Sequence, residues 1–235
     1  MVKIRFIAHA NKFNLSFQNI KRMLTVHKLV FNAFQENTFV IEAENKECII
    51  VDPGCSNPTE NHQLKSFINQ NGLTPKKLVL THFHLDHVFG NQYVKDEWGL
   101  LPTGHKDGEF TMSGNQRACE LYGIQYIPSP PIAHFINDGD EIALGTDVIK
   151  ILHVPGHSTG HVALVSETSN WVIAGDVLFQ QSIGRTDLPG GDFDVLEKSI
   201  KEKMYMLPDE MVVYCGHGPE TSIGNEKFAN PFVRG

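Results

Sequence analysis

The chain has 235 residues, of which 41% are hydrophobic and 20% are charged, which is the composition of an ordinary globular protein built as one large domain. Its net charge of −7 leaves no broad basic excess, which excludes a nucleic-acid partner bound mainly through its phosphates. No apolar stretch approaches the about 20 residues that cross a bilayer, so we expect no membrane partner.

The cysteines indicate the compartment. Cys48, Cys55, Cys119 and Cys215 are scattered through the chain without CxxC spacing. A chain of this length can build a full hydrophobic core and does not need a disulfide framework. We therefore expect reduced thiols and a cytoplasmic protein.

Residues 1–22 differ from the rest of the chain. They begin basic and apolar, but the apolar part is short, is soon interrupted by asparagine, and has no cleavage site of the secretory kind. Met23 directly precedes the first convincing strand. We expect residues 1–22 to be an extension outside a domain that spans residues 23–235. An upstream start choice could produce such an extension, and a mitochondrial-type targeting peptide is the alternative.

Strands dominate the first half of the domain. Apolar runs and turn residues predict strands at residues 24–31, 37–43 and 46–52, a helix at residues 59–69, and a buried strand at residues 78–80. Further on we expect helices at residues 90–98 and 106–123, the second of them broken near Gly114, and a short strand at residues 101–105. The proline-rich residues 127–132 form either a stiff pocket wall or a plain connector.

The second half of the domain repeats this order. Strands are predicted at residues 135–142, 146–152, 160–165 and 170–174, followed by a helix at residues 193–206. Asp192 is the expected N-cap of that helix. Two β-rich halves, each followed by helices, predict an α/β fold in which two sheets form a sandwich with helices on both outer faces.

Residues 81–87, with the sequence Thr-His-Phe-His-Leu-Asp-His, are the most informative stretch. They follow the buried strand at residues 78–80 and contain His82, His84, Asp86 and His87. Histidine and aspartate are costly to bury unless something pairs them, and a metal ion suits imidazole and carboxylate together. Because His82 and His84 are two residues apart on extended backbone, they project to the same side. Four such ligands would crowd one tetrahedral ion, so the pattern indicates two neighbouring metal positions.

Three later strands end in the same way. His157, Asp176 and His217 each follow an apolar run and are flanked by glycine. The carboxyl ends of strands in α/β sheets are where ligands collect, and glycine lets the backbone approach closely there. We expect these side chains to join the stretch at residues 81–87.

The motifs HxHxDH, PGHSxGH, GD and GHG occur in this order from residue 82 to residue 218, and the set resembles the metallo-β-lactamase superfamily. The resemblance implies a four-layer αββα sandwich. It implies that His82, His84 and His157 hold a first metal ion, that Asp86, His87 and His217 hold a second, and that Asp176 bridges the two.

The implied chemistry is hydrolysis. Two divalent cations lower the pKa of bound water from about 15.7 towards about 7, and the resulting metal-bound hydroxide attacks a carbonyl or phosphorus centre. Asp86 and Asp176 are the candidate catalytic residues, with Asp86 also orienting the hydroxide. We expect zinc, with iron or manganese as alternatives, because histidine and aspartate suit all three.

The stretch at residues 182–192 further resembles the short glyoxalase II-like proteins. This likeness implies a thioester substrate of the S-lactoylglutathione type, with Arg185 pairing a substrate carboxylate. A salt bridge from Arg185 to Asp187 or Asp192 is the alternative. Only 18 residues follow His217, so we expect no C-terminal helical domain for glutathione, and the substrate is a small thioester or ester.

Three questions stay open in the sequence. Asp52, at another strand end, either forms a turn or supports a metal-binding histidine. His161 is expected to pack or support rather than to bind the metal. The reaction has an alternative on the same fold, a mononuclear iron persulfide dioxygenase, whose Gly-Arg-Thr-Asp stretch is closely similar.

Overall fold

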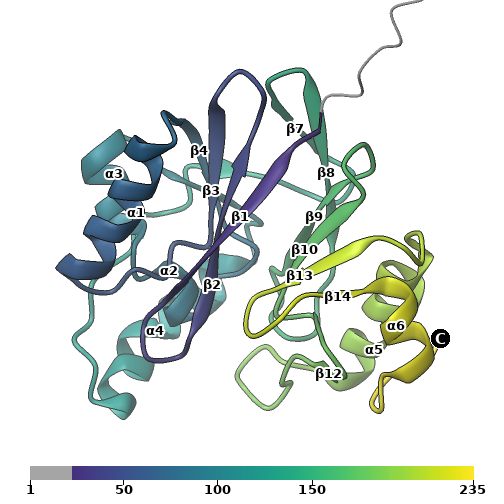
Figure 1. Cartoon of the computed structure of the whole chain (residues 1–235). Coiled ribbons are helices and arrows are strands. Elements are labelled where there is room, and N and C mark those ends of the chain that lie inside the picture. Colours follow the sequence, from purple (N-terminus) through teal and green to yellow (C-terminus); the bar gives the residue numbers. More distant parts are fainter. Residues whose placement is uncertain (1–22) are drawn as a thin grey trace, which may run out of the picture.

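A computed structural model describes residues 23–235, so the predictions made for residues 1–22 lie outside the described part. Two six-stranded sheets lie against each other, and helices lie on their outer sides (Figure 1). The predicted α/β sandwich with four layers is confirmed. None of the helices within residues 23–235 is both long and apolar enough to span a membrane.

The first sheet begins as an antiparallel meander and continues with parallel strands. Its order is β1 (Thr25–Phe31), β2 (Glu36–Glu42), β3 (Glu47–Val51), β4 (Thr74–Val79), β5 (Pro102–Gly104) and β6 (His134–Phe135). The connections between the parallel strands contain α1 (Pro58–Gln70), α2 (Leu85–Val88), α3 (Asn91–Trp98) and α4 (Gly108–Tyr122).

The second sheet has the order β14-β13-β10-β9-β8-β7. Its strands are β7 (Glu141–Leu144), β8 (Asp147–His153), β9 (Val162–Ser166), β10 (Trp171–Gly175), β13 (Val212–Cys215) and β14 (Thr221–Ser222). A two-stranded ribbon of β11 (Leu178–Phe179) and β12 (Ser182–Ile183) precedes α5 (Phe193–Glu202), the 3₁₀ turn η1 (Met204–Met206) and, after β14, α6 (Ile223–Ala229).

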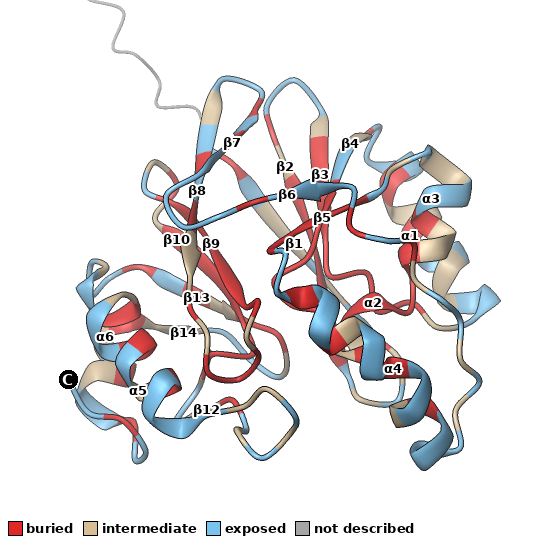
Figure 2. Ribbon diagram, turned by 180° about the vertical axis from the view of Figure 1, so that it is seen from behind, coloured by how far each residue is buried: buried red, intermediate tan, exposed pale blue. Residues whose placement is uncertain are grey.

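Side chains that point alternately to the two faces of each strand create the layers. In β10, Trp171 and Ile173 enter the core between the two sheets, whereas Val172 and Ala174 enter the core beneath α5. Because successive side chains of a strand point to opposite faces, an entirely apolar strand packs on both sides. The central strands β2, β3, β9 and β10 are accordingly buried, whereas the edge strands β1 and β6 and the outer faces of the helices are largely exposed (Figure 2). All four cysteines are buried and unpaired.

Helix caps follow the expected chemistry. The Asp192 carboxylate accepts the N–H of Val195 and begins α5, as the sequence predicts. Asn57 accepts the N–H groups of Thr59 and Glu60 and begins α1.

Three element predictions are wrong. Residues 135–142 do not form one strand, because β6 belongs to the first sheet and β7 to the second. The helix α4 has no break at Gly114, where an added side chain would meet open space and no neighbour demands a bend. The helix predicted at residues 193–206 ends at Glu202 and tightens into η1.

Candidate metal centre

The seven predicted ligands come together at the carboxyl ends of the strands. His82 and His84 follow β4, His157 follows β8, Asp176 follows β10 and His217 follows β13, while Asp86 and His87 lie in α2. The parallel pair β10–β13 places Gly175 opposite Cys215, and the N–H of Gly216 donates to the Gly175 carbonyl at 2.8 Å. This pairing brings Asp176 and His217 to one edge of the sheet.

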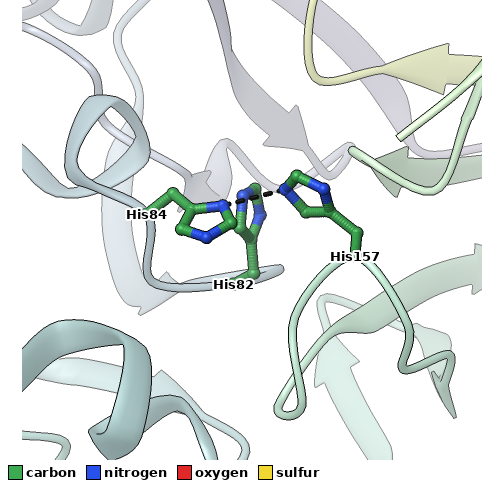
Figure 3. A group of neighbouring side chains, drawn as sticks. All are labelled: His82, His84 and His157. Atoms are coloured by element: carbon green, nitrogen blue, oxygen red, sulfur yellow. Dashed lines mark hydrogen bonds between the residues drawn. The ribbon is translucent and has the colours of Figure 1, made fainter. Parts of the chain in front are cut away.

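His82, His84 and His157 form the first trio (Figure 3). One ring nitrogen from each lies within 4.8 Å of the others, and His84 Nδ1 is 2.8 Å from His157 Nε2. The His82 ring meets the other two nearly edge-on, with centroid distances of 4.9 and 5.0 Å. Three imidazoles that converge in this way can hold one metal ion.

Asp86, His87 and His217 form the second trio. The Asp86 carboxylate lies 3.2 Å from His217 Nε2 and 3.8 Å from His87 Nε2. This trio is more open than the first, since the His217 side chain is 27% exposed. The second trio is therefore the one that solvent meets at His217.

Asp176 lies between the trios. One carboxylate oxygen is 3.4 Å from His87 Nε2, and the other is 3.7 Å from His157 Nε2 and 3.5 Å from His217 Nε2. The same carboxylate thus faces imidazoles of both trios, which is the position that the family resemblance implies for a bridging ligand.

Hydrogen bonds to backbone carbonyls fix the tautomers of two histidines. His157 Nδ1 donates to the carbonyl of Arg185 at 2.8 Å, and His217 Nδ1 donates to the carbonyl of Phe34 at 3.0 Å. A carbonyl only accepts, so each Nδ1 carries a proton and each Nε2 faces the centre.

Asp52 fixes the other two buried rings. Its Oδ2 lies 3.1 Å from His87 Nδ1 and accepts the Thr81 hydroxyl at 2.5 Å. The Thr81 oxygen in turn lies 3.1 Å from His82 Nδ1 and accepts from it, because its own proton goes to Asp52. Asp52 also accepts the N–H of Thr81 at 2.7 Å, so it shapes the turn as well as supporting two metal-facing histidines.

The buried polar atoms of the centre fit cations. Those without a hydrogen-bond partner are His82 Nε2, His84 Nε2, His87 Nε2 and Asp176 Oδ1. Leaving such atoms unpaired in the interior is costly, and the contact with Thr81 puts the proton of His82 on Nδ1 and its lone pair on Nε2. Divalent cations would satisfy these ring nitrogens and the carboxylate oxygen together.

Burial and neighbours set the protonation of the centre. Burial lowers the pKa of His84 to about 3, with a further contribution from His157, so that ring is neutral, the form that binds a metal. Burial also opposes the charged form of His217, but hydrogen bonds to Asp176 and Asp86 outweigh it and raise the pKa of His217 to about 10. Burial opposes ionisation of Asp176 as well, yet His87 and His217 hold the pKa of its carboxyl well below the usual range.

His161 supports the centre from outside. Its Nε2 accepts the N–H of Asp176 at 3.1 Å, and its ring stacks on His82 with centroids 4.7 Å apart. A nitrogen engaged by a peptide N–H has no free lone pair, so His161 acts through Asp176 and His82, as expected from the sequence.

Sequence reasoning missed Glu36, which is completely buried behind the second trio. Its carboxyl group hydrogen-bonds the Thr38 hydroxyl at 2.8 Å and lies 3.8 Å from His87 Nδ1. Burial raises the pKa of Glu36 well above its usual value. The available signal was a charged residue shortly before the apolar stretch at residues 39–41.

Arg185 does not present a free guanidinium. Its Nε and Nη2 donate to the two carboxylate oxygens of Asp187 at 2.7 and 2.8 Å. Of the two roles that the sequence left open, the geometry matches the salt bridge to Asp187.

Two further groups have ligand atoms within 4.8 Å of one another. Asp52, His82 and His87 share their histidines with the two trios, whereas His105, Asp107 and His153 stand apart from them. The rings of His105 and His153 are stacked 4.2 Å apart at an interplanar angle of 7°. Parallel rings keep their in-plane lone pairs parallel, so these two do not converge on one ion.

The sequence signature of the Metallo-beta-lactamase superfamily matches residues 31–217, the range that contains all seven predicted ligands. The chain belongs to this superfamily. Superfamily relatives include a probable metallo-hydrolase, YqgX of Bacillus subtilis, which is 36% identical over 86% of this chain and 93% of its own. The hydroxyacylglutathione hydrolase GloC of Haemophilus influenzae is 34% identical over 89% of this chain and 98% of its own.

Solved structures agree with the superfamily assignment. The BLEG-1 B3 metallo-beta-lactamase covers 90% of this chain with a TM-score of 0.82 and 34% identity, all of its own chain being matched. TTHA1623, solved in a di-iron-bound form, covers 88% of this chain with a TM-score of 0.79 and 33% identity, again over its full length. The chain is therefore a superfamily metallohydrolase whose His and Asp clusters can bind metal ions.

Proposed function

We propose that the chain is a dinuclear metal-dependent hydrolase of small thioesters. The observation that carries the proposal is the place of Asp176, whose carboxylate lies 3.4 Å from an imidazole of one trio and 3.7 Å from an imidazole of the other. A carboxylate that faces both trios is placed to contact two neighbouring cations at once.

The proposed ligands follow the two trios. His82, His84 and His157 would hold a first ion, Asp86, His87 and His217 would hold a second, and Asp176 would serve both. Zinc is the metal we propose, and iron and manganese suit the same donors. The di-iron form of TTHA1623 supports two ions in one centre of this fold, with iron among the candidates.

Two divalent cations, when bound, acidify a water molecule and polarise the carbonyl that it attacks. The chain supplies the positioning. Asp86 lies 3.2 Å from His217 Nε2 at the more exposed trio, where its carboxylate can accept a proton of the attacking water and orient it. Hydrolysis adds water to the thioester carbonyl, breaks the C–S bond, and yields a carboxylate, a thiol and a proton.

Two observations support a thioester substrate, a similar protein and the position of one loop. GloC, named as a hydroxyacylglutathione hydrolase, matches this chain over almost its whole length. The Gly-Arg-Thr-Asp stretch at residues 184–187 runs beside the centre. Gly184 lies so close to the Asp176 carbonyl that an added Cβ would collide with it. We further propose a small-molecule partner and a reducing, cytoplasmic setting, in keeping with four buried, unpaired cysteines.

The test is a hydrolysis screen on protein of known metal content. Thioesters, lactones and phosphodiesters are compared at matched concentrations, with His84→Ala as the inactive variant and His62→Ala as its control. His62 is exposed on α1, and its ring contacts Ser66 alone among the hydrogen bonds of residues 23–235. We expect thioesters to be preferred and the activity to be lost only in His84→Ala. A preference for phosphodiesters, or equal activity in both variants, would contradict the proposal.

A further inference from the structure

The backbone of Arg185 is fixed at the rim of the metal centre. Its carbonyl accepts from His157 Nδ1 at 2.8 Å, and Gly184 before it packs against the carbonyl of Asp176. The Arg185 side chain is nevertheless 54% exposed, so its guanidinium stands in solvent beside the centre rather than in the core.

The guanidinium is already occupied. Asp187 accepts from Nε at 2.7 Å and from Nη2 at 2.8 Å, which is the bidentate geometry that a substrate carboxylate would need. The hydrogen bonds from Arg185 lower the pKa of Asp187 to about 2, so the pair stays charged and intact at neutral pH.

Two aromatic rings continue the rim from Arg185. The Tyr122 hydroxyl lies within reach of the Arg185 guanidinium and, after the larger effect of Asp187, contributes to the raised pKa of Arg185. The Tyr122 ring packs edge-on against Phe34 with centroids 5.7 Å apart. The Phe34 carbonyl holds His217 at 3.0 Å. One rim thus runs from His157 through Arg185, Tyr122 and Phe34 to His217.

We infer that this rim is a specificity subsite for the thiol part of the substrate, and that Asp187 makes it select thioesters whose thiol part carries no carboxylate there. This inference rests on the proposed function. The pair of Arg185 and Asp187 is neutral overall, and Tyr122 and Phe34 offer ring surface and one hydroxyl, which suit an uncharged amide or alkyl group. A carboxylate has to displace Asp187, which is tethered two residues away and competes as an internal ligand.

The size of the effect follows from the exposure of the pair. Ion pairs in solvent are weak, so the discrimination between an uncharged and a carboxylate-bearing thiol is about two- to fivefold. Removing the charge of Asp187 frees the guanidinium, so the carboxylate-bearing thiol gains by about the same factor and the preference is lost.

The experiment compares two thioesters that differ only at this position, the S-lactoyl esters of 3-mercaptopropionamide and 3-mercaptopropionate. The readout is the ratio of their kcat/KM values in metal-loaded wild type, Asp187→Asn, and the double variant Asp187→Asn with Arg185→Met. Asp209→Asn is the matched control, since it removes the carboxylate of another exposed pair, with Lys227 at 2.7 Å. We expect the amide to be preferred in wild type and in Asp209→Asn, the carboxylate to gain about two- to fivefold in Asp187→Asn, and this gain to vanish in the double variant.

Calorimetric binding of the corresponding thioethers, which cannot be hydrolysed, separates this inference from the proposed function. If neither thioester is hydrolysed, the proposed function fails, while the thioether affinities still report the selectivity. An equal response of both compounds to Asp187→Asn, in kinetics and in binding, overturns the inference. A gain for the carboxylate that persists in the double variant overturns it too, because the gain then does not come from Arg185.

Discussion

Asp52 Oδ2 lies 3.1 Å from His87 Nδ1, and the same oxygen accepts the Thr81 hydroxyl that meets His82 at 3.1 Å. A single buried carboxylate therefore orients one imidazole from each proposed metal position. Partners of this kind set the tautomer and the direction of a ligand without touching the metal.

Replacement of Asp52 by asparagine should weaken metal binding about 10–100-fold, because the amide carries no charge to hold the His87 proton. Asparagine tolerates the left-handed backbone that Asp52 adopts, with φ of 48°, so the change isolates the carboxylate. Competition titration against a chelator measures the affinity. An unchanged affinity in a correctly folded variant would assign Asp52 to the turn alone.

Gly216 leaves no room for a side chain. A Cβ there would collide with Asp176 Oδ1 and reach 3.0 Å from His87 Cε1. Gly216→Ala should therefore displace the bridging carboxylate, lower the metal content to about one ion per chain or less, and abolish hydrolysis.

Gly114→Ala is the control for that change. Its Cβ meets nothing within 4 Å in the middle of α4, and alanine should raise the free energy of unfolding by about 0.5–1 kcal/mol. Metal analysis and denaturant titration of both variants check the pair. Full metal content in Gly216→Ala would show that the Asp176 carboxylate does not bridge where we place it.

Loss of the His161 acceptor should also reach the metals. His161→Phe keeps a ring against His82 but leaves the N–H of Asp176 without its partner at 3.1 Å. The unpaired buried donor costs about 1–3 kcal/mol of folding free energy, and the freed Asp176 loop should weaken metal binding. A stability loss with unchanged metal affinity would limit His161 to packing.

Metal binding should release protons at neutral pH. The pKa of His217, opposed by burial but raised to about 10 by Asp176 and Asp86, keeps this ring protonated in the metal-free protein at pH 7. A metal ion needs the neutral ring, so affinity should rise as the pH rises towards 10 and fall on acidification. Calorimetry of metal binding in buffers of different ionisation enthalpy counts the protons. A binding enthalpy that does not depend on the buffer would mean that His217 releases no proton when the metal binds.

The candidate metal ligands and the layers of the fold could be predicted from the sequence, because both depend on patterns of residues close together in the chain. His82, His84 and Asp86 lie within five residues, and central strands such as β9 and β10 are buried along their whole length. Sequence reasoning could not place β6, two residues long and exposed, whose sheet is decided by pairing with distant β5.

Contacts between distant segments were also out of reach. The rim formed by Phe34, Tyr122 and Arg185 brings together the β1–β2 turn, the end of α4 and the loop after β12. None of these residues belongs to a shared local pattern. The burial of Glu36 was hidden for the same reason, since its carboxyl group packs against His87 from another element.

The number of metal ions per folded chain tests the central claim most directly. Elemental analysis after saturation with zinc, and separately with iron under anaerobic conditions, should give about two ions per chain, because we propose that the two trios and Asp176 form two ligand sets. A ratio of one iron per chain, with oxygen uptake in place of thioester hydrolysis, would contradict the dinuclear hydrolase and favour the mononuclear oxygenase.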